Sequence, residues 1–334
     1  MPDDSAQHMQ CMEVWGGSEL TTRNVEMGGL DAWIYSKPFG QSQDGGDVYY
    51  ASSCATGRIN RLLLADVAGH GKAVAETASG LRTLMRRYVN FLDQTEFVRS
   101  MNRQFTSISE SGCFATAVVT TFFAPTRLFS VCNAGHPRPL LYRATTGQWT
   151  LLEHSDDASI ARQHRPEASN IPLGIVDLTD YEQFEVALEV GDLVLCYTDA
   201  LIESRDANGE FLGEDGLLKI INSLSGVDRP HLLIDSLLKA MGQIHPRNLL
   251  EDDVTVLLLR PNGNRPRSTF VGRLGATLKV MVAILRSVNP RAERPPLPDF
   301  RLANIGGMLF PPLQKRWRAG RRGGGQPAKS LHSD

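Results

Sequence analysis

Leu64-Ala65-Asp66-Val67-Ala68-Gly69-His70-Gly71 joins an apolar run to a glycine-rich loop and places one carboxylate at the junction. The residues that lead into it, 59–67, include four consecutive apolar side chains, which predicts a strand that is covered on both faces and ends near Asp66. A carboxylate at the end of a buried strand is costly unless a positive group meets it, and no Lys or Arg adjoins Asp66 in the sequence. Asp66 is therefore the first candidate metal ligand of the chain.

Three more aspartates occur in the same setting, at the edge of an apolar, strand-like run. Oxygen ligands of this kind suit Mg²⁺ or Mn²⁺, whereas zinc favours His and Cys. We therefore expect a hard divalent cation where these side chains meet. The three are Asp47 in Gly45-Gly46-Asp47, Asp199 in Cys196-Tyr197-Thr198-Asp199, and Asp252 in Glu251-Asp252-Asp253-Val254-Thr255.

The composition of the 334 residues is that of a globular protein with enough material for a large core. Hydrophobic residues make up 42% and charged residues 22%. The five cysteines are an odd number without Cys-x-x-Cys spacing, which excludes an obvious disulfide framework or zinc site. The start of the chain has no apolar segment typical of a secretory signal, and no run of 18 apolar residues predicts a transmembrane segment. The expected location is a reducing cytoplasm.

Charge divides the chain into an acidic body and a basic C-terminal part. Residues 261–334 hold 14 Lys and Arg against three acidic residues, so the remainder has 21 basic and 34 acidic residues. We predict an N-terminal extension (1–29), a folded domain (30–261) and a basic extension rich in Pro, Gly and Arg (262–334), with a helix at 270–288. The basic extension is either a solvated, self-docking segment or a contact for a partner or membrane. Because the body is acidic, no nucleic-acid partner is expected.

Hydrophobic periodicity predicts an α+β fold. Short connections between the strands of residues 114–152 require antiparallel neighbours, and a meander is the simplest arrangement. Many antiparallel strands with paired helices indicate two stacked sheets flanked by helices. Asp44-Gly45-Gly46 is expected to form a turn. The predicted strands are 31–36, 48–52, 59–67, 114–123, 127–133, 139–143, 148–152, 181–190, 193–198 and 254–259, and the predicted helices are 72–88, 95–108, 215–224 and 230–244.

Seven separated blocks, which together span about residues 30–260, resemble the SpoIIE-like branch of the metal-dependent PPM protein serine/threonine phosphatases. The resemblance implies a four-layer α/β/β/α sandwich of two antiparallel sheets flanked by helices. The blocks are Gly45-Gly46-Asp47, Asp66-Val67-Ala68-Gly69-His70-Gly71, Asn133-Ala134-Gly135-His136-Pro137, Pro172-Leu173-Gly174, Gly191-Asp192-Leu193, Thr198-Asp199-Ala200-Leu201-Ile202-Glu203 and Asp252-Asp253-Val254-Thr255.

The resemblance also implies a site for two divalent metal ions, Mg²⁺ or Mn²⁺. By motif position, Asp66 bridges both ions, Asp47 and the backbone carbonyl of Val67 hold one, and Asp199 and Asp252 hold the other. Asp253 is then left to a turn or to support of the site. A water activated by the two ions attacks the phosphorus of phosphoserine or phosphothreonine, so that no protein nucleophile is needed.

Histidines and small polar residues in or near these motifs have catalytic or structural interpretations. His70 is a candidate catalytic general acid, and locking the glycine-rich loop is the structural alternative. His136 is expected to be structural, because a turn between two strands needs its hydrogen bonds satisfied. Thr116 and Asn133 are interpreted as packing or turn residues.

Two departures from the family pattern keep a second class of function open. Family members commonly carry an acid three residues after the Gly-Gly-Asp aspartate, where this chain has Tyr50, and glycine after the Thr-Asp aspartate, where it has Ala200. The alternative is a catalytically weak or inactive phosphatase-fold scaffold that binds phosphoproteins. Retention of the four metal aspartates favours the enzyme, since a binding module has no use for such concentrated negative charge.

The family implies a phosphorylated protein substrate in a bacterial signalling pathway, with an anti-sigma-factor antagonist as one candidate. The segment before residue 30 is too short for a sensor domain. We therefore expect regulation through the basic extension, a partner protein, or homodimer formation through the helices at 72–108.

Overall fold

Two mostly antiparallel sheets form the centre of the molecule in the computed structural model. All pairs within them are antiparallel except β1 with β3. The structure describes residues 7–9, 14–40, 42–54, 57–68, 74, 77–81, 83–84, 94–108, 113–153, 170–177 and 179–264.

The two sheets contain seven and six strands. The seven-stranded sheet has, in spatial order, β1 (Gln7–His8), β3 (Thr21–Met27), β4 (Leu30–Lys37), β13 (Val254–Pro261), β12 (Leu193–Tyr197), β9 (Leu140–Arg143) and β10 (Gln148–Leu151). The six-stranded sheet has β11 (Gln183–Ala187), β8 (Leu128–Ala134), β7 (Ala115–Phe123), β6 (Ile59–Val67), β5 (Asp44–Cys54) and β2 (Val14–Glu19).

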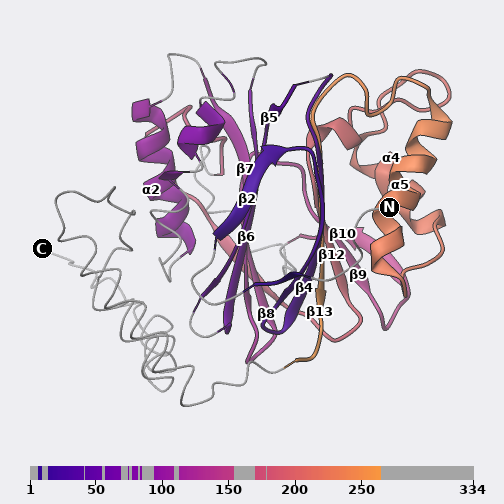
Figure 1. The fold of residues 1–334 in the computed structure, drawn as a ribbon, viewed down its shortest axis with the longest axis horizontal. Helices are drawn as coiled ribbons and strands as arrows, with labels where there is room; N and C mark the ends of the chain where they lie inside the picture. Colours follow the sequence, from indigo (N-terminus) through magenta and orange to yellow (C-terminus); the bar gives the residue numbers. More distant parts are fainter. Residues whose placement is uncertain are drawn as a thin grey trace, which may run out of the picture.

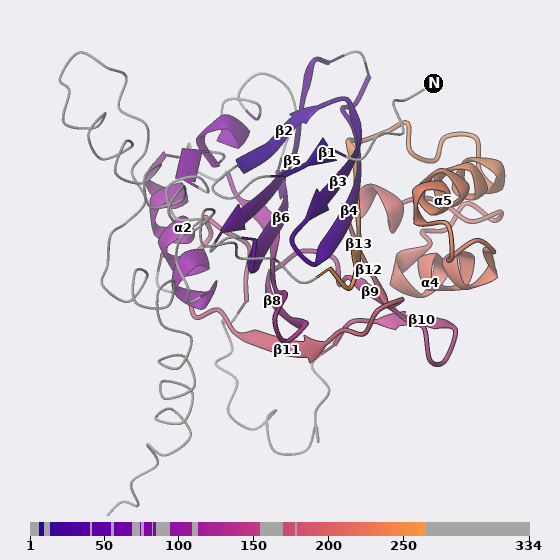
Figure 2. The same cartoon turned by 60° about the horizontal axis from the view of Figure 1, so that its bottom comes forward.

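Helices cover the outer face of each sheet, so the molecule has four layers. Helix α2 (Gln94–Ile108) lies outside the six-stranded sheet, and α4 (Gly213–Ser223) and α5 (Pro230–Ile244) lie outside the seven-stranded sheet (Figure 1). The view in Figure 2 separates the same layers. The predicted α/β/β/α sandwich is confirmed.

Three apolar cores fill the spaces between the four layers, because the central strands send alternate side chains to opposite faces. In β6, Leu62 and Leu64 join the core between the sheets, whereas Leu63 and Ala65 join the core beneath α2. A third core packs α4 and α5 onto β12 and β13. This burial on both faces explains the continuous apolar run that precedes Asp66.

The predicted strands and helices correspond to observed elements, with differences in how they connect. Asp44-Gly45-Gly46 begins strand β5 instead of forming a turn. The predicted meander is interrupted, because β7 and β8 lie in one sheet and β9 and β10 in the other. The chain crosses between the sheets in the Gly135-His136-Pro137 segment.

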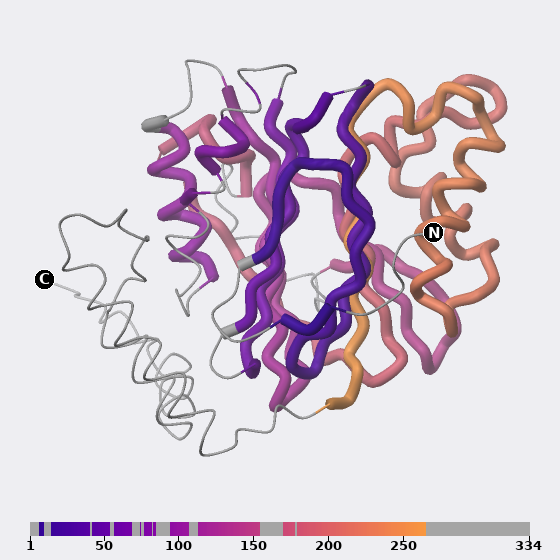
Figure 3. Tube along the Cα trace, viewed as in Figure 1, coloured from indigo at the N-terminus to yellow at the C-terminus, as the bar shows by residue number. Residues whose placement is uncertain are grey.

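The predicted N-terminal extension differs most from the structure. Strand β2 pairs with β5 and β3 pairs with β4, so residues 14–27 contribute a strand to each sheet. Only Leu20 separates β2 from β3, and the chain changes sheets there (Figure 3). The boundary at residue 30 therefore cuts through the folded body. The predicted helix at 270–288 lies outside the described residues, as does most of 72–88, of which residues 74, 77–81 and 83–84 are helical.

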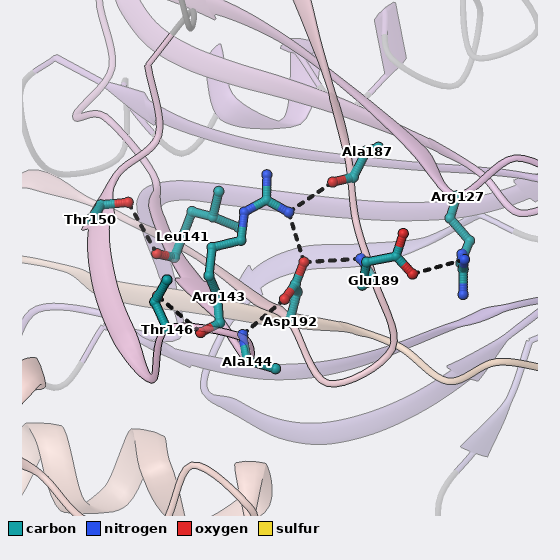
Figure 4. Close-up of polar contacts among 9 residues, drawn as sticks. All are labelled: Arg127, Leu141, Arg143, Ala144, Thr146, Thr150, Ala187, Glu189 and Asp192. Atoms are coloured by element: carbon teal, nitrogen blue, oxygen red, sulfur yellow. Dashed lines mark hydrogen bonds and ion pairs between the residues drawn. The ribbon is translucent and has the colours of Figure 1, made fainter.

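Asp192, in the Gly191-Asp192-Leu193 block, ties the two sheets together just before β12, whereas the candidate ligand Asp199 follows the other end of that strand. Its side chain is 1% exposed and accepts hydrogen bonds of 2.8 Å from Arg143 and 2.9 Å from the backbone N–H of Ala144 and Glu189 (Figure 4). Arg143 also donates to the backbone carbonyl of Ala187, in β11 of the other sheet. This motif aspartate therefore has a structural role.

Candidate metal centre

Two of the predicted ligands lie side by side on adjacent strands of the six-stranded sheet. Asp47 of β5 is directly opposite Asp66 of β6 in the antiparallel register. Both share a face of the sheet with Tyr49 and Leu64, which belong to the core between the sheets. The two carboxylates therefore point toward the seven-stranded sheet.

The other two predicted ligands come from the seven-stranded sheet. Asp199 begins a short 3₁₀ helix, η2 (Asp199–Leu201), directly after β12, and Asp252 lies just before β13. A buried hydrogen bond joins the two sheets at this point, because Thr198 Oγ1 donates to Asp47 Oδ2 at 2.8 Å. Thr198 also accepts the backbone N–H of Thr255 at 3.0 Å. The adjacent ends of β12 and β13 in the seven-stranded sheet thus face the β5–β6 pair of the six-stranded sheet.

Asp253 organises the backbone around the site. Its carboxylate accepts the backbone N–H groups of Phe39 and Gly46 at 2.5 Å each and that of Asp47 at 3.3 Å. Asp252 Oδ1 accepts the Asp253 N–H at 2.8 Å. The Asp253 oxygens are therefore occupied by the protein backbone, whereas Asp252 retains an oxygen without a hydrogen bond among the described residues.

The two glycines before Asp47 are required by this close approach. A Cβ atom on Gly45 would lie 2.6–2.7 Å from the carboxylate of Asp253. A Cβ atom on Gly46 would lie 3.0 Å from the Val67 carbonyl oxygen, the predicted backbone ligand. The first distance is shorter than real Cβ contacts and the second is at the tight end of their range, so the Gly-Gly pair lets β5 approach the ends of β6 and β13 closely.

The four candidate ligands repel one another. Burial and the neighbouring carboxylate of Asp66 raise the pKa of Asp47 well above its usual value, against the hydrogen bond from Thr198. Burial, followed by the charges of Asp199 and Asp252, raises the pKa of Asp66 to about 7. Burial and nearby Glu203 raise the pKa of Asp199 to about 6. Partial burial also raises the pKa of Asp252.

These carboxylates fit a hard divalent cation. No ion pair between described residues involves Asp47, Asp66, Asp199 or Asp252. Within the described ranges, no three histidine, cysteine or acidic side chains lie as close together as the ligands of one ion. Mg²⁺ usually keeps several of its waters, so it does not need a closed protein cage. Carboxylates that form no ion pair with another described residue are available as ligands of such an ion.

The histidines of the motifs differ in what the structure says of them. His70 lies outside the described residues. His136 is 5% exposed, and burial lowers its pKa to about 3, so its ring is neutral. Asn133 exchanges two hydrogen bonds with the His136 backbone, and Thr116 bonds to His136 Nδ1 at 2.8 Å. This network supports the structural interpretation of His136, and Thr116 connects it to Asp66, its cross-strand neighbour.

Sequence reasoning did not identify the supporting role of Thr198 or fully define that of Asp253. Thr198 directly precedes Asp199 in a quoted block, but a threonine does not signal a cross-sheet contact. The two departures from the family pattern have plain packing roles. Tyr50 is 2% exposed on the opposite face of β5 from Asp47, in the core beneath α2, and Ala200 is 7% exposed against α4 and α5.

Comparisons with known proteins identify the family and the fold of this chain. Residues 57–262 match the family model described as stage II sporulation protein E (SpoIIE). Phosphoserine phosphatase RsbU of Bacillus subtilis (strain 168) is 27% identical over 246 residues, which cover 72% of this chain and 66% of RsbU. The chain thus spans just under two thirds of the length of this curated relative.

Two solved structures share the fold. The PP2C phosphatase domain of SpoIIE from Bacillus subtilis, solved with a fragment of its regulatory domain, has a TM-score of 0.55 and 15% identity, over 75% of this chain and 64% of that one. RsbX in complex with magnesium has a TM-score of 0.51 and 15% identity, over 72% of this chain and 99% of that one. The family match covers more than half of the sequence, and the chain therefore belongs to the SpoIIE family, with the PP2C (PPM) fold.

Proposed function

We propose that this protein is a metal-dependent protein serine/threonine phosphatase that hydrolyses phosphoserine or phosphothreonine in a signalling partner. The convergence of Asp47, Asp66, Asp199 and Asp252 from two sheets is the observation that supports this function best. Family membership and the similarity to RsbU, a phosphoserine phosphatase, support the same reaction.

The proposed ligands divide between two divalent ions, Mg²⁺ or Mn²⁺. Asp66 lies opposite Asp47 in the strand register, and burial and the charges of Asp199 and Asp252 raise its pKa, which supports its assignment as the bridging ligand. Asp47 and the Val67 carbonyl hold one ion, and Asp199 and Asp252 hold the other. When bound, such ions activate a water and neutralise charge on the transferred phosphoryl group.

The surrounding residues keep these ligands in position. Thr198 orients one oxygen of Asp47, and Asp253 fixes the backbone on which Asp47 is carried. The neutral ring of His136 and the hydroxyl of Thr116 support the end of β6 that carries Asp66. We assign His70, in the glycine-rich loop after Val67, as the candidate proton donor to the departing serine or threonine oxygen.

The proposed substrate is a phosphorylated protein, with an anti-sigma-factor antagonist as the first candidate by family analogy. In the described part of the chain, every helix is too short or too polar to cross a membrane. The proposed catalytic domain comprises residues 30–261 together with the N-terminal strands β2 and β3, and cytoplasmic location and homodimer formation remain part of the proposal.

Hydrolysis of para-nitrophenyl phosphate with Mn²⁺ tests this function. We expect activity in the full chain that a chelator abolishes, and a loss of about 100-fold or more in kcat for Asp66→Asn and Asp199→Asn, because even groups that support metal ligands are worth about 10–100-fold. Asp228→Asn is the matched control, since its side chain is 80% exposed in a surface pair. Activity that survives chelation or both ligand substitutions would refute the two-metal site.

A further inference from the structure

A polar cavity of about 260 Å³ lies beside the carboxylate cluster, on the side of Asp252. One wall is the segment that follows η2, and the other is the segment between α5 and β13. Because Asp252 and the η2 residue Ala200 line it, the cavity continues directly from the proposed metal centre. Its polar lining includes Glu203, Ser204, Arg205, Arg247, Asn248 and Glu251.

A buried asparagine holds the two walls together. Asn248 is 7% exposed; its Oδ1 accepts the Arg205 backbone N–H at 2.7 Å, and its Nδ2 donates to the Arg205 carbonyl at 2.9 Å and the Met241 carbonyl at 3.0 Å. The next residue, Leu249, has φ of 63°, a left-handed conformation that is rare for leucine. Cavities with walls fixed in this way bind ligands without an additional ordering cost.

An aromatic ring and two arginines are the recognition groups of the cavity. Phe211 is 62% exposed, and the Arg205 guanidinium lies 4.8 Å from its ring centroid. Arg205 Nη1 donates to the Gly209 carbonyl at 2.7 Å. Arg247 is 78% exposed and has only a 3.8 Å surface contact with Glu251, a pair of little energetic value. Exposed aromatic and arginine side chains are the groups that dominate binding at protein interfaces.

Charge indicates what these groups face. Glu203 stands at the metal-centre end of the cavity, because its backbone N–H donates to the carbonyl of Asp199 at 2.8 Å. Asp252 is a proposed metal ligand. With Glu203 and Asp252 assigned to the metal centre, the remaining charged residues of the cavity are Arg205, Arg247 and Glu251. Their net charge is positive, which favours a negatively charged ligand group.

We propose that this cavity receives the polypeptide segment next to the phosphoserine or phosphothreonine of the substrate, with an acidic side chain against Arg205 and Arg247 and its aliphatic part on Phe211. The proposal rests on the proposed phosphatase function. Pockets for small ligands have volumes of about 300 Å³ or more. This cavity, at about 260 Å³, is slightly smaller and suits one or two side chains of a bound segment.

Steady-state kinetics on phosphoserine peptides test the proposal. The peptides have one length and carry Glu, Ala or Lys near the phosphoserine on either side, and para-nitrophenyl phosphate serves as the substrate without flanking residues. We expect the full chain to prefer the Glu peptides. In Phe211→Ala and Arg247→Gln, the ratio of kcat/KM for the Glu peptide to kcat/KM for para-nitrophenyl phosphate falls about tenfold, or 1.4 kcal/mol, and the preference for Glu is lost.

The controls substitute the same residue types, or similar ones, outside the cavity. Arg229→Gln removes another exposed arginine and Leu232→Ala another exposed apolar side chain, both near the start of α5. Equal activity of the full chain on the Glu, Ala and Lys peptides overturns the proposal, as does a parallel loss on peptide and para-nitrophenyl phosphate in the cavity variants. Absence of metal-dependent activity on every substrate refutes the phosphatase function itself, and this proposal with it.

Discussion

Asp66→Asn is expected to stabilise the metal-free protein at pH 8 while removing its catalytic activity. Asp66 stands opposite Asp47 in the strand register, and burial and the charges of Asp199 and Asp252 raise its pKa to about 7. An asparagine has nearly the same shape and carries no charge. The Asp66 side chain forms no hydrogen bond with another described residue, so the substitution breaks none of these. The substitution therefore relieves a repulsion that the native protein tolerates for function.

The magnitude follows from the pKa. A rise from 3.8 to about 7 corresponds to about 4 kcal/mol at 1.36 kcal/mol for each pKa unit. Solvent relaxation around a half-buried carboxylate reduces this energy, so we expect about 2–4 kcal/mol. For a domain of this size, about 2–4 °C for each kcal/mol gives a rise in Tm of about 4–16 °C.

The sign of the pH dependence is fixed by the direction of the shift. A carboxyl whose pKa is raised on folding binds more protons in the folded state, so its stabilising contribution is complete below pH 3.8 and is lost as the pH rises through about 7. Asp199, with a pKa of about 6, acts in the same direction. The metal-free protein therefore loses stability between about pH 4 and pH 7, and Asp66→Asn flattens that loss.

Thermal unfolding in EDTA at pH 5 and pH 8, followed by circular dichroism with and without Mn²⁺, measures these effects. We expect Mn²⁺ to raise the Tm of the native chain at pH 8 and to leave Asp66→Asn much less changed. Asp192→Asn is the contrasting control, because that buried carboxylate is paired and its substitution lowers Tm. A Tm of Asp66→Asn below that of the native chain at pH 8 in EDTA would refute the repulsion argument.

Three further substitutions test the packing around the site. Asp192→Ala leaves Arg143 without its buried partner and is expected to lower the free energy of unfolding in urea by about 3–5 kcal/mol; a loss below 1 kcal/mol would contradict the clamp. Asn248→Ala removes three hydrogen bonds and should lower the same free energy by about 1–3 kcal/mol, whereas exposed Asn208→Ala should not. Gly45→Ala pushes on the Asp253 carboxylate, so calorimetry should show Mn²⁺ affinity reduced about tenfold or more; unchanged affinity would separate Asp253 from the site.

The sequence predicted the elements of the fold better than their connections. The continuous apolar run of β6 and the period of α2 are strong local signals, and both elements were predicted within one residue of their bounds. The segment between β8 and β9 is short and contains turn residues, as a hairpin connection does. Its length therefore does not indicate that the chain passes from one sheet to the other. The N-terminal strands were missed because β2 and β3 contain polar residues and glycines and gain their stability from pairing with β5 and β4.

For the candidate site, the positions of the aspartates were predictable and their neighbours were not. Each aspartate ends or precedes an apolar run, and motif order indicated that they converge. Strand parity places Asp47 and Asp66 on the inner face, a fact that follows from the register once β5 and β6 are paired. The separation of Asp252 from Asp253 depends on which oxygens accept backbone N–H groups, and those contacts come from residues more than 200 positions away.

The hydrogen bond between Thr198 and Asp47 spans the boundary between the two sheets. A displacement of one sheet along the other that breaks this bond would free the Asp47 carboxylate to rotate. Relative sliding of the halves is thereby converted into a change of ligand geometry. A protein that binds the helices on the outer face of one sheet and displaces that sheet would change the rate of turnover without contacting any group that carries out the reaction.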